Sequence, residues 1–366
     1  MINSKFLEPI NGEPDKERLF AAFKRKKVDR VPNLEILIED KHIEKFLGRY
    51  AGNSLAIGGD PAKGEVSDNI RPMHPDDFID LCNMIGQDAM IFDAGLLTPF
   101  YREDNNGNLM PVLDKSVSNK EDFKKVKLLS DKQIDKAVKF VKEYKEAIAQ
   151  RRSKVAVIPC YGCIFQTLYE FLFKMNDFMM LCYEDRLFIE EMLELSATHY
   201  EKMTKAVVEA GADAVFPADD VAFRTGLFVP PKLFKEIWVP RMARIFKPAL
   251  DSNVPIIFHS DGKIDEIVDD LIEMGLDCLN PMDPSGIDYA DYKKRFGNRL
   301  SFCGNVNVDL LSNGTPEEIY EDVKKHMDIM KPGYGYVIGS SHSIVNYIPH
   351  ENVIAYFNAI HKYGLY

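Results

Sequence analysis

An imidazole and a carboxylate follow the same apolar run closely enough to share a ligand. His259 ends the run that begins at Val254, and Asp261 comes two residues later. Histidine nitrogens and carboxylate oxygens are both zinc ligands, so the pair predicts a metal site. Each residue also has a structural alternative: His259 as a hydrogen-bonded histidine at a strand end, and Asp261 as the cap of a helix that begins near Ile264.

Asp219 and Asp220 are two adjacent carboxylates after an earlier apolar run. Neighbouring side chains in an extended segment point in opposite directions, so we expect one to face a site and the other to be structural. The facing carboxylate is predicted to be a zinc ligand or a general acid, and the second role requires a pKa raised by burial. His342, between two serines after the last apolar run, is a further candidate site residue, with a capping or phosphate-binding turn as the alternative.

Polar groups end several other apolar runs, and we predict that four of them bind substrate: Asp93, Tyr161, Asn280 and Asn305. Tyr161 lies within Cys160-Tyr-Gly-Cys163, which has the spacing of a metal or redox pair. Because no second cysteine pair accompanies it, we interpret this stretch as a tight strand–helix turn.

Eight short apolar runs rich in Val, Ile and Phe precede these residues, and such runs are typical of strands buried on both faces. Helical patterns separate them: Thr315-Pro-Glu-Glu has a capping threonine and a proline at the first helical position, and Gly275 ends another helix. Eight strand–helix units predict a closed parallel barrel with the polar groups at one end. The runs cover residues 31–37, 88–93, 154–160, 214–217, 254–259, 277–281, 300–305 and 335–339.

The length of 366 residues fits one α/β domain, residues 1–366, built as a (β/α)8 TIM barrel with N-terminal and inter-strand extensions. Residues 53–69, rich in Gly, Asp, Lys and Ser, are expected to form a surface loop or lid. Residues 104–108 are expected to form a hairpin turn. Neither stretch has the composition of a linker between domains.

The net charge of −11 argues against nucleic-acid binding, which requires a basic face. Six cysteines at uneven spacing, and a start without an apolar leader, predict a reducing cytoplasm. No stretch of the sequence is long and apolar enough to span a bilayer. The composition therefore favours a cytoplasmic protein that acts on small molecules.

Several stretches along the chain together carry a family pattern. They are Glu17 to Pro32, Asp219-Asp220, Phe258-His-Ser-Asp-Gly262, Gly304-Asn-Val-Asn307, Gly314-Thr-Pro-Glu-Glu318, Gly339-Ser-Ser-His-Ser-Ile344 and Pro349-His-Glu-Asn352. In this order they resemble the uroporphyrinogen decarboxylase superfamily, and within it the corrinoid-dependent methyltransferases. The resemblance implies a (β/α)8 barrel and one of two chemistries: decarboxylation of a porphyrinogen without a cofactor, or methyl transfer involving the cobalt of a corrinoid, usually with zinc.

The resemblance favours methyl transfer. The decarboxylase carries Arg-Gln-Ala-Gly-Arg shortly after its first strand, where cations hold substrate carboxylates, but this chain has Asn33-Leu-Glu-Ile-Leu-Ile-Glu-Asp40, whose acids would repel them. Thiol-methylating members carry His-x-Cys on the fifth strand and a further Cys near the eighth. Here Asp261 replaces the first Cys, and Ser341 or His342 stands in the late region. Either the metal has been lost, or these harder ligands serve an oxygen-bound substrate.

We therefore predict a zinc-dependent methyltransferase of the O-demethylase type. The resemblance implies that it moves a methyl group from a methylated small molecule, such as an aryl methyl ether, to the cobalt of a separate corrinoid protein docked over the barrel mouth. His259 would hold zinc with Asp261, His342 or one of Asp219 and Asp220. The alternatives are a cofactor-free decarboxylase and a ligand-binding barrel without catalysis.

Overall fold

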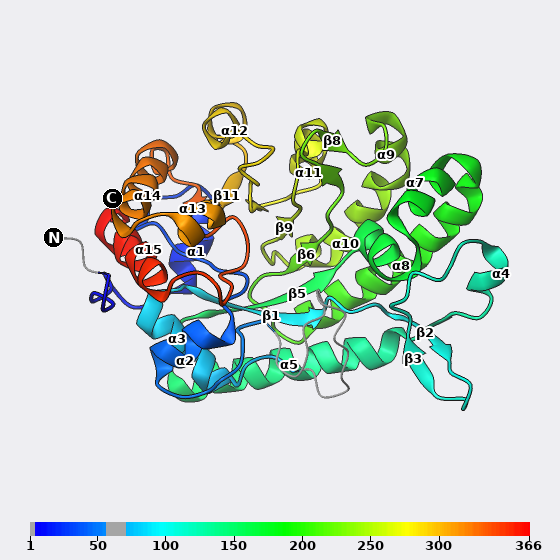
Figure 1. Ribbon diagram of the computed structural model, residues 1–366, viewed down its shortest axis with the longest axis horizontal. Helices are drawn as coiled ribbons and strands as arrows, with labels where there is room; N and C mark the ends of the chain where they lie inside the picture. Colours follow the sequence, from blue (N-terminus) through cyan, green and yellow to red (C-terminus); the bar gives the residue numbers. More distant parts are fainter. Residues whose placement is uncertain (1–3, 56–70) are drawn as a thin grey trace.

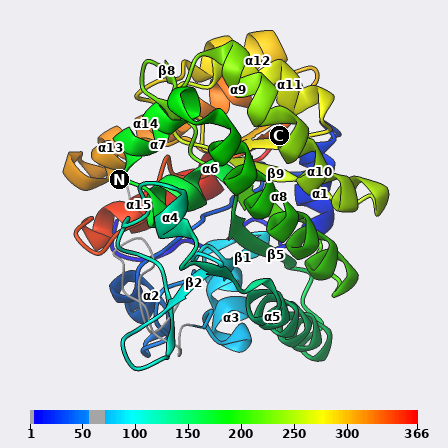
Figure 2. The same ribbon diagram turned by 90° about the vertical axis from the view of Figure 1, so that its right-hand side faces the viewer.

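Seven parallel strands form a curled sheet, and helices cover its outer face (Figure 1, Figure 2). The computed structural model describes residues 4–55 and 71–366. Neighbouring strands follow chain order, as in a barrel of strand–helix units, so the predicted α/β barrel class is confirmed. The strands are β1 (Ala89–Gly95), β5 (Ala156–Gly162), β6 (Phe216–Ala218), β9 (Ile257–His259), β10 (Cys278–Asn280), β11 (Ser301–Cys303) and β12 (Tyr336–Val337).

The predicted first strand, residues 31–37, joins the two edges of this sheet through single bridges instead of a ladder. Asn33 pairs in parallel with Gln87, just before β1, and with Ile338, just after β12. Ile338 donates its N–H to the Pro32 carbonyl at 2.9 Å, whereas Pro32 has no N–H to donate, which limits the ladder. This segment occupies the eighth position and closes the barrel.

Long helices pack against the outside of the sheet and against one another. In Figure 2, α5, α8 and α10 lie side by side around the strands, and the contacts between these helices agree. The capping box predicted at Thr315 is present at the start of α14. The outer helices are α3 (Pro75–Ile85), α5 (Ser130–Arg151), α8 (Arg186–Glu209), α10 (Val239–Asp251), α11 (Val268–Glu273), α12 (Tyr289–Phe296), α14 (Pro316–Met330) and α15 (His350–Tyr363).

The strand side chains alternate between two apolar layers. On β1, Ala89 and Ile91 belong to the layer inside the barrel, whereas Met90 and Phe92 belong to the layer between sheet and helices. The helix α1 (Lys16–Phe23) adds apolar side chains to the inner layer. The inner layer therefore fills the barrel below its carboxyl-end mouth.

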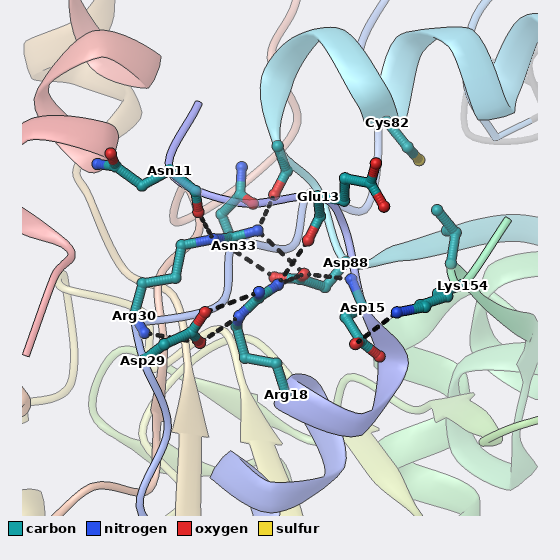
Figure 3. A network of polar contacts seen from close by, with 12 residues as sticks. Asn11, Glu13, Asp15, Arg18, Asp29, Arg30, Asn33, Cys82, Asp88 and Lys154 are labelled. Atoms are coloured by element: carbon teal, nitrogen blue, oxygen red, sulfur yellow. Dashed lines mark hydrogen bonds and ion pairs between the residues drawn. The ribbon is translucent and has the colours of Figure 1, made fainter. Parts of the chain in front are cut away.

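A buried ion-pair network ties the amino-terminal segment to the start of β1 (Figure 3). Asp88 is fully buried and accepts from Arg30 Nη1 and Nη2, both at 3.1 Å, and from Arg18 Nη1 at 2.6 Å. The Asp15 N–H also donates to Asp88 at 2.8 Å, and Arg18 pairs with the exposed Asp29. Since Asp88 directly precedes β1, the network lies at the barrel end opposite the carboxyl ends of the strands.

The connections carry the remaining elements. The predicted turn at residues 104–108 joins an antiparallel hairpin of β2 (Phe100–Glu103) and β3 (Leu109–Pro111), which confirms the prediction. Residues 56–69 of the expected loop or lid lie outside the described residues. The other elements are α2 (Asp40–Leu47), α4 (Lys120–Phe123), β4 (Lys127–Leu128), α6 (Ile164–Thr167), η2 (Leu168–Leu172), α7 (Met175–Glu184), β7 (Ala222–Phe223), β8 (Gly226–Leu227), α9 (Pro231–Ile237), η3 (Asp265–Ile267) and α13 (Val308–Asn313). Among the helices of the described ranges, none has the length and apolar character needed to cross a membrane.

Candidate functional site

Three of the predicted residues meet at the carboxyl ends of two adjacent strands. His259 is the last residue of β9 and pairs in parallel with Ala218, the last residue of β6. This register brings Asp220, two residues after β6, beside His259 and Asp261. One ligand atom from each lies within 4.8 Å of the others, and His259 Nε2 is 3.8 Å from Asp220 Oδ1. One imidazole and two carboxylates form a donor set that suits zinc.

Asn280, at the end of β10, fixes the proton position on His259. Asn280 Oδ1 lies 2.8 Å from His259 Nδ1, and Asn280 Nδ2 donates to the Cys303 carbonyl at 3.3 Å. Because the second bond assigns Oδ1 as the acceptor, Nδ1 of His259 carries the hydrogen. The neutral ring then has its lone pair on Nε2, near Asp220, and this is the tautomer that a metal requires.

The surrounding charges favour a cation at this imidazole. Burial alone would lower the pKa of His259, but the nearby Asp261 and Asp220 carboxylates outweigh burial and raise it. Burial also raises the pKa of Asp261, against the effect of His259. A metal cation at Nε2 would take the place of the proton and compensate the two carboxylates.

Backbone and amide groups hold the two carboxylates in place. Asp220 Oδ1 accepts from the Asp261 N–H at 2.8 Å, and Asp220 Oδ2 accepts from Gln166 Nε2 at 3.2 Å. Gly262 follows with a φ of +84°, and a Cβ there would lie 2.4 Å from the Ala222 carbonyl oxygen. Glycine is therefore required at the turn that presents Asp261.

A cavity of about 270 Å³ opens beside the three ligands. Ile36, Leu96 and Phe171 are among its apolar lining residues, and Asp220, His259 and Asp261 are among its polar ones. His342 also lines the cavity, with Nε2 4.0 Å from Asp261 Oδ2 on a side chain that is 59% exposed. A small, partly apolar pocket with convergent polar groups at the strand carboxyl ends is the arrangement expected of a barrel enzyme.

The uroporphyrinogen decarboxylase (URO-D) family profile matches residues 98–363, which is well over half of the sequence. The chain belongs to the URO-D family. It resembles in sequence the methylcobamide:CoM methyltransferase MtaA of Methanosarcina barkeri (strain Fusaro / DSM 804), with 29% identity over 226 residues, 60% of this chain and 62% of the relative. A uroporphyrinogen decarboxylase of Pseudoalteromonas translucida (strain TAC 125) is 25% identical over 168 residues, 43% of this chain and 44% of the relative.

The chain thus spans less than two thirds of the length of these two relatives. A solved structure of a methyltransferase from Methanosarcina mazei shares the fold of this URO-D family chain along nearly its whole length. Its TM-score is 0.65 at 18% identity, over 96% of this chain and 99% of that chain. The family therefore links this chain both to corrinoid methyltransferases and to decarboxylases.

In this URO-D family chain, Asp219 points away from the three ligands. It is fully buried and accepts from the N–H groups of Phe165 at 3.0 Å and Gln166 at 2.6 Å, and from Trp238 Nε1 at 2.8 Å. Burial raises the pKa of Asp219 to about 7 against these donors. Asp219 holds the start of α6, and of the two adjacent carboxylates Asp220 is the one that lines the cavity.

Two predicted substrate-binding residues, Tyr161 and Asp93, are not among the described residues that line the cavity. Tyr161 is buried toward α8, where its hydroxyl shares a hydrogen bond with Thr204 Oγ1 at 2.8 Å, because on β5 it alternates with Cys160, which lines the cavity. Its position does not fit direct substrate contact. Asp93 accepts from the Leu96 N–H at 2.8 Å and so supports a residue of the cavity wall.

The two predicted asparagines also lie outside the described lining of the cavity. Asn280 contacts His259 instead, as described above. Asn305 Nδ2 donates to the Met282 carbonyl at 2.6 Å, and its buried Oδ1 has no hydrogen-bond partner within the described part of the chain. Both asparagines are better placed to orient neighbouring groups than to contact a substrate.

We expect Asn280→Ala to weaken zinc binding by about 10–100-fold, because His259 Nδ1 loses the acceptor that orients the ring. Zinc affinity is measured by competition with a chromogenic chelator. Asn280→Asp keeps an oxygen acceptor and should retain more affinity than the alanine variant. Equal affinity in the wild type and Asn280→Ala would contradict this role.

Sequence reasoning missed Glu35, which is buried against α15. Its carboxylate accepts from the Ser340 N–H at 3.1 Å and from the Tyr356 hydroxyl at 2.5 Å. The Ser340 hydroxyl contacts both Glu35 and the His342 carbonyl. Glu35 thus supports the loop that carries His342. The sequence does contain a signal for this role, because Glu35 is a single carboxylate inside an apolar run. A carboxylate that is buried with such a run needs buried hydrogen-bond partners.

We expect Glu35→Gln to flatten the pH dependence of stability. Burial raises the pKa of Glu35 from 4.5 to about 7. Between these two pH values the folded protein holds a proton that the unfolded chain releases. The free energy of unfolding therefore falls as the pH rises from 4.5 to about 7. The neutral amide removes this penalty, which amounts to at most about 3 kcal/mol. Urea denaturation at pH 5 and pH 8 measures it, with the exposed Glu44→Gln as control. The same pH dependence in Glu35→Gln and wild type would refute the assignment.

Proposed function

We propose that this chain is a zinc-dependent methyltransferase that moves a methyl group from an aryl methyl ether to the cobalt of a corrinoid protein. The observation that carries the proposal is the meeting of Asp220, His259 and Asp261 at the edge of a partly apolar cavity. The similarity to a methylcobamide:CoM methyltransferase supports corrinoid-linked methyl transfer. The free, buried state of all six cysteines fits a reducing cytoplasm.

In this proposal His259 Nε2 and one oxygen each of Asp220 and Asp261 would hold the zinc ion, with His342 beside them. Bound zinc supplies Lewis acidity to the leaving oxygen of the ether. The hydrogen bond from His259 Nδ1 to Asn280 keeps the ring in the metal-binding tautomer. Asp220 is fixed by the Asp261 N–H and by Gln166, so the site is largely organised before substrate binds.

The cavity lining supports a methylated aromatic donor. Ile36, Leu96 and Phe171 offer apolar contacts to a ring, and the three ligands lie next to the same space. Among the described lining residues there is no Lys or Arg that could hold the carboxylates of a porphyrinogen. This favours methyl transfer over the decarboxylation known in the same family.

The decisive experiment combines metal analysis with a spectral assay. Elemental analysis of the purified protein should find about one zinc per chain. Mixing the zinc-loaded protein with cobalt(I) corrinoid protein and an anisole-type donor should remove the cobalt(I) absorbance as the methyl group is transferred. Failure to bind added zinc, together with an unchanged cobalt(I) spectrum across a panel of aryl methyl ethers, would refute the proposal.

A further inference from the structure

Glu170 lines the proposed substrate cavity and is a carboxylate without a hydrogen-bond or ion-pair partner among the described residues. Glu170 lies on the π-helix η2, is half-buried and contributes to the cavity wall. Within the described residues its side chain makes no hydrogen bond or ion pair. Phe171, the next residue, is buried and lines the same cavity. Single π-helical turns are rare and often occur at functional sites.

Among the described lining residues of the cavity, no Lys or Arg compensates the charge of Glu170. The described lining contains three carboxylates, those of Glu170, Asp220 and Asp261, and neither Lys nor Arg. A zinc ion held by Asp220 and Asp261 would balance those two charges, but not the charge of Glu170. Inside a partly apolar pocket, a fixed negative charge attracts a cationic ligand and repels an anionic one.

We propose that Glu170 selects a methyl donor that carries a positively charged nitrogen, so that the ether bears an ammonium group. The carboxylate provides the ion pair, and the ring of Phe171 beside it offers a surface on which a cation is favourable. The inference rests on the proposed function only in taking this cavity as the donor site. The negative charge of Glu170 should exclude donors that carry a carboxylate or a sulfonate. Plain anisoles, which carry no charge, should bind weakly.

Three probes of similar shape test the proposal: 4-methoxybenzylamine, which is cationic at pH 7, 4-methylanisole, which is neutral, and 4-methoxybenzoate, which is anionic. Calorimetric titration of zinc-loaded protein, without corrinoid protein, should show the amine binding at least about tenfold more tightly than the neutral ether. The benzoate should bind most weakly. Repeating the titration in zinc-free protein separates ion pairing at Glu170 from ligation of zinc by the amine.

Glu170→Gln should weaken binding of the amine about tenfold and leave binding of the neutral ether within about twofold. Glu170→Asp keeps the charge and should retain most of the preference. Glu184→Gln, an exposed carboxylate on the nearby helix α7, is the matched control and should behave like the wild type. The circular dichroism spectrum of each variant verifies the fold.

The outcomes separate this inference from the proposed function. Any of three results would overturn the cation preference. These are equal binding of the amine and the benzoate, an equal loss of affinity for all three probes in Glu170→Gln, and no binding of any probe. Selective binding of the amine without loss of the cobalt(I) absorbance would support the cation preference and count against methyl transfer. Methyl transfer that is equally fast from the neutral ether and the amine would support the proposed function and count against the cation preference.

Discussion

His259→Ala is expected to abolish zinc binding and methyl transfer together. The substitution removes the imidazole of the three-ligand cluster and leaves Asp220 and Asp261 facing each other without it. Since a metal contributes several kcal/mol to the stabilisation of a leaving oxygen, and each 1.4 kcal/mol is about tenfold in rate, the rate should fall by about 1,000-fold or more. Zinc content and the initial rate of cobalt(I) methylation measure the two losses.

Two further variants serve as controls for this experiment. His259→Gln keeps most of the side-chain volume and should be equally inactive with an unchanged fold. His74→Ala removes an exposed histidine outside the cavity and should keep its zinc and its rate. A His259→Ala protein that turns over like the wild type would exclude the metal role assigned to this residue.

Asp88→Ala is expected to cost about 3–5 kcal/mol of unfolding free energy. The substitution leaves the guanidinium of Arg30, which is only 3% exposed, without its paired charge, and also removes one of the two carboxylates that pair with Arg18. Uncompensated buried charges are far more costly than lost surface pairs. Urea denaturation followed by circular dichroism measures the loss.

The same network provides the control. Asp29 pairs with Arg18, but its side chain is 62% exposed, so Asp29→Ala should cost about 0–1 kcal/mol. Because the network lies at the opposite end of the barrel from the cavity, the folded fraction of Asp88→Ala should still bind zinc. Comparable losses in the two variants would contradict the importance given to burial.

The sequence could predict the barrel and much of the candidate site because both depend on local patterns. Apolar runs bounded by polar residues located the strands, and His259 with Asp261 marked the end of one of them. The fact that Asp219 and Asp220 face opposite ways follows from backbone alternation alone. Which of them faces the cavity depends on the pairing of Ala218 with His259, and this pairing is not encoded within either strand.

The remaining features depend on tertiary contacts. Tyr161 follows an apolar run and is predicted to bind substrate, but only the packing of β5 against α8 shows that its hydroxyl lies at Thr204. Asn280 ends its own strand, and only the neighbouring strand reveals that it orients His259. Glu170 lies in a π-helical turn that has no distinct sequence signature. Each of these positions is decided by a neighbour distant in sequence.

The way in which the barrel closes has a consequence for the order of folding. The bonds between Glu35 and Ser340 span 305 residues, whereas the bond between Asp220 and Asp261 spans 41. The entropic cost of closing a loop rises with its length, and contacts of high sequence separation form slowly. During refolding, zinc capture should therefore precede closure, and the amide protons of Leu34 and Glu35 should gain protection from exchange after those of β6 and β9.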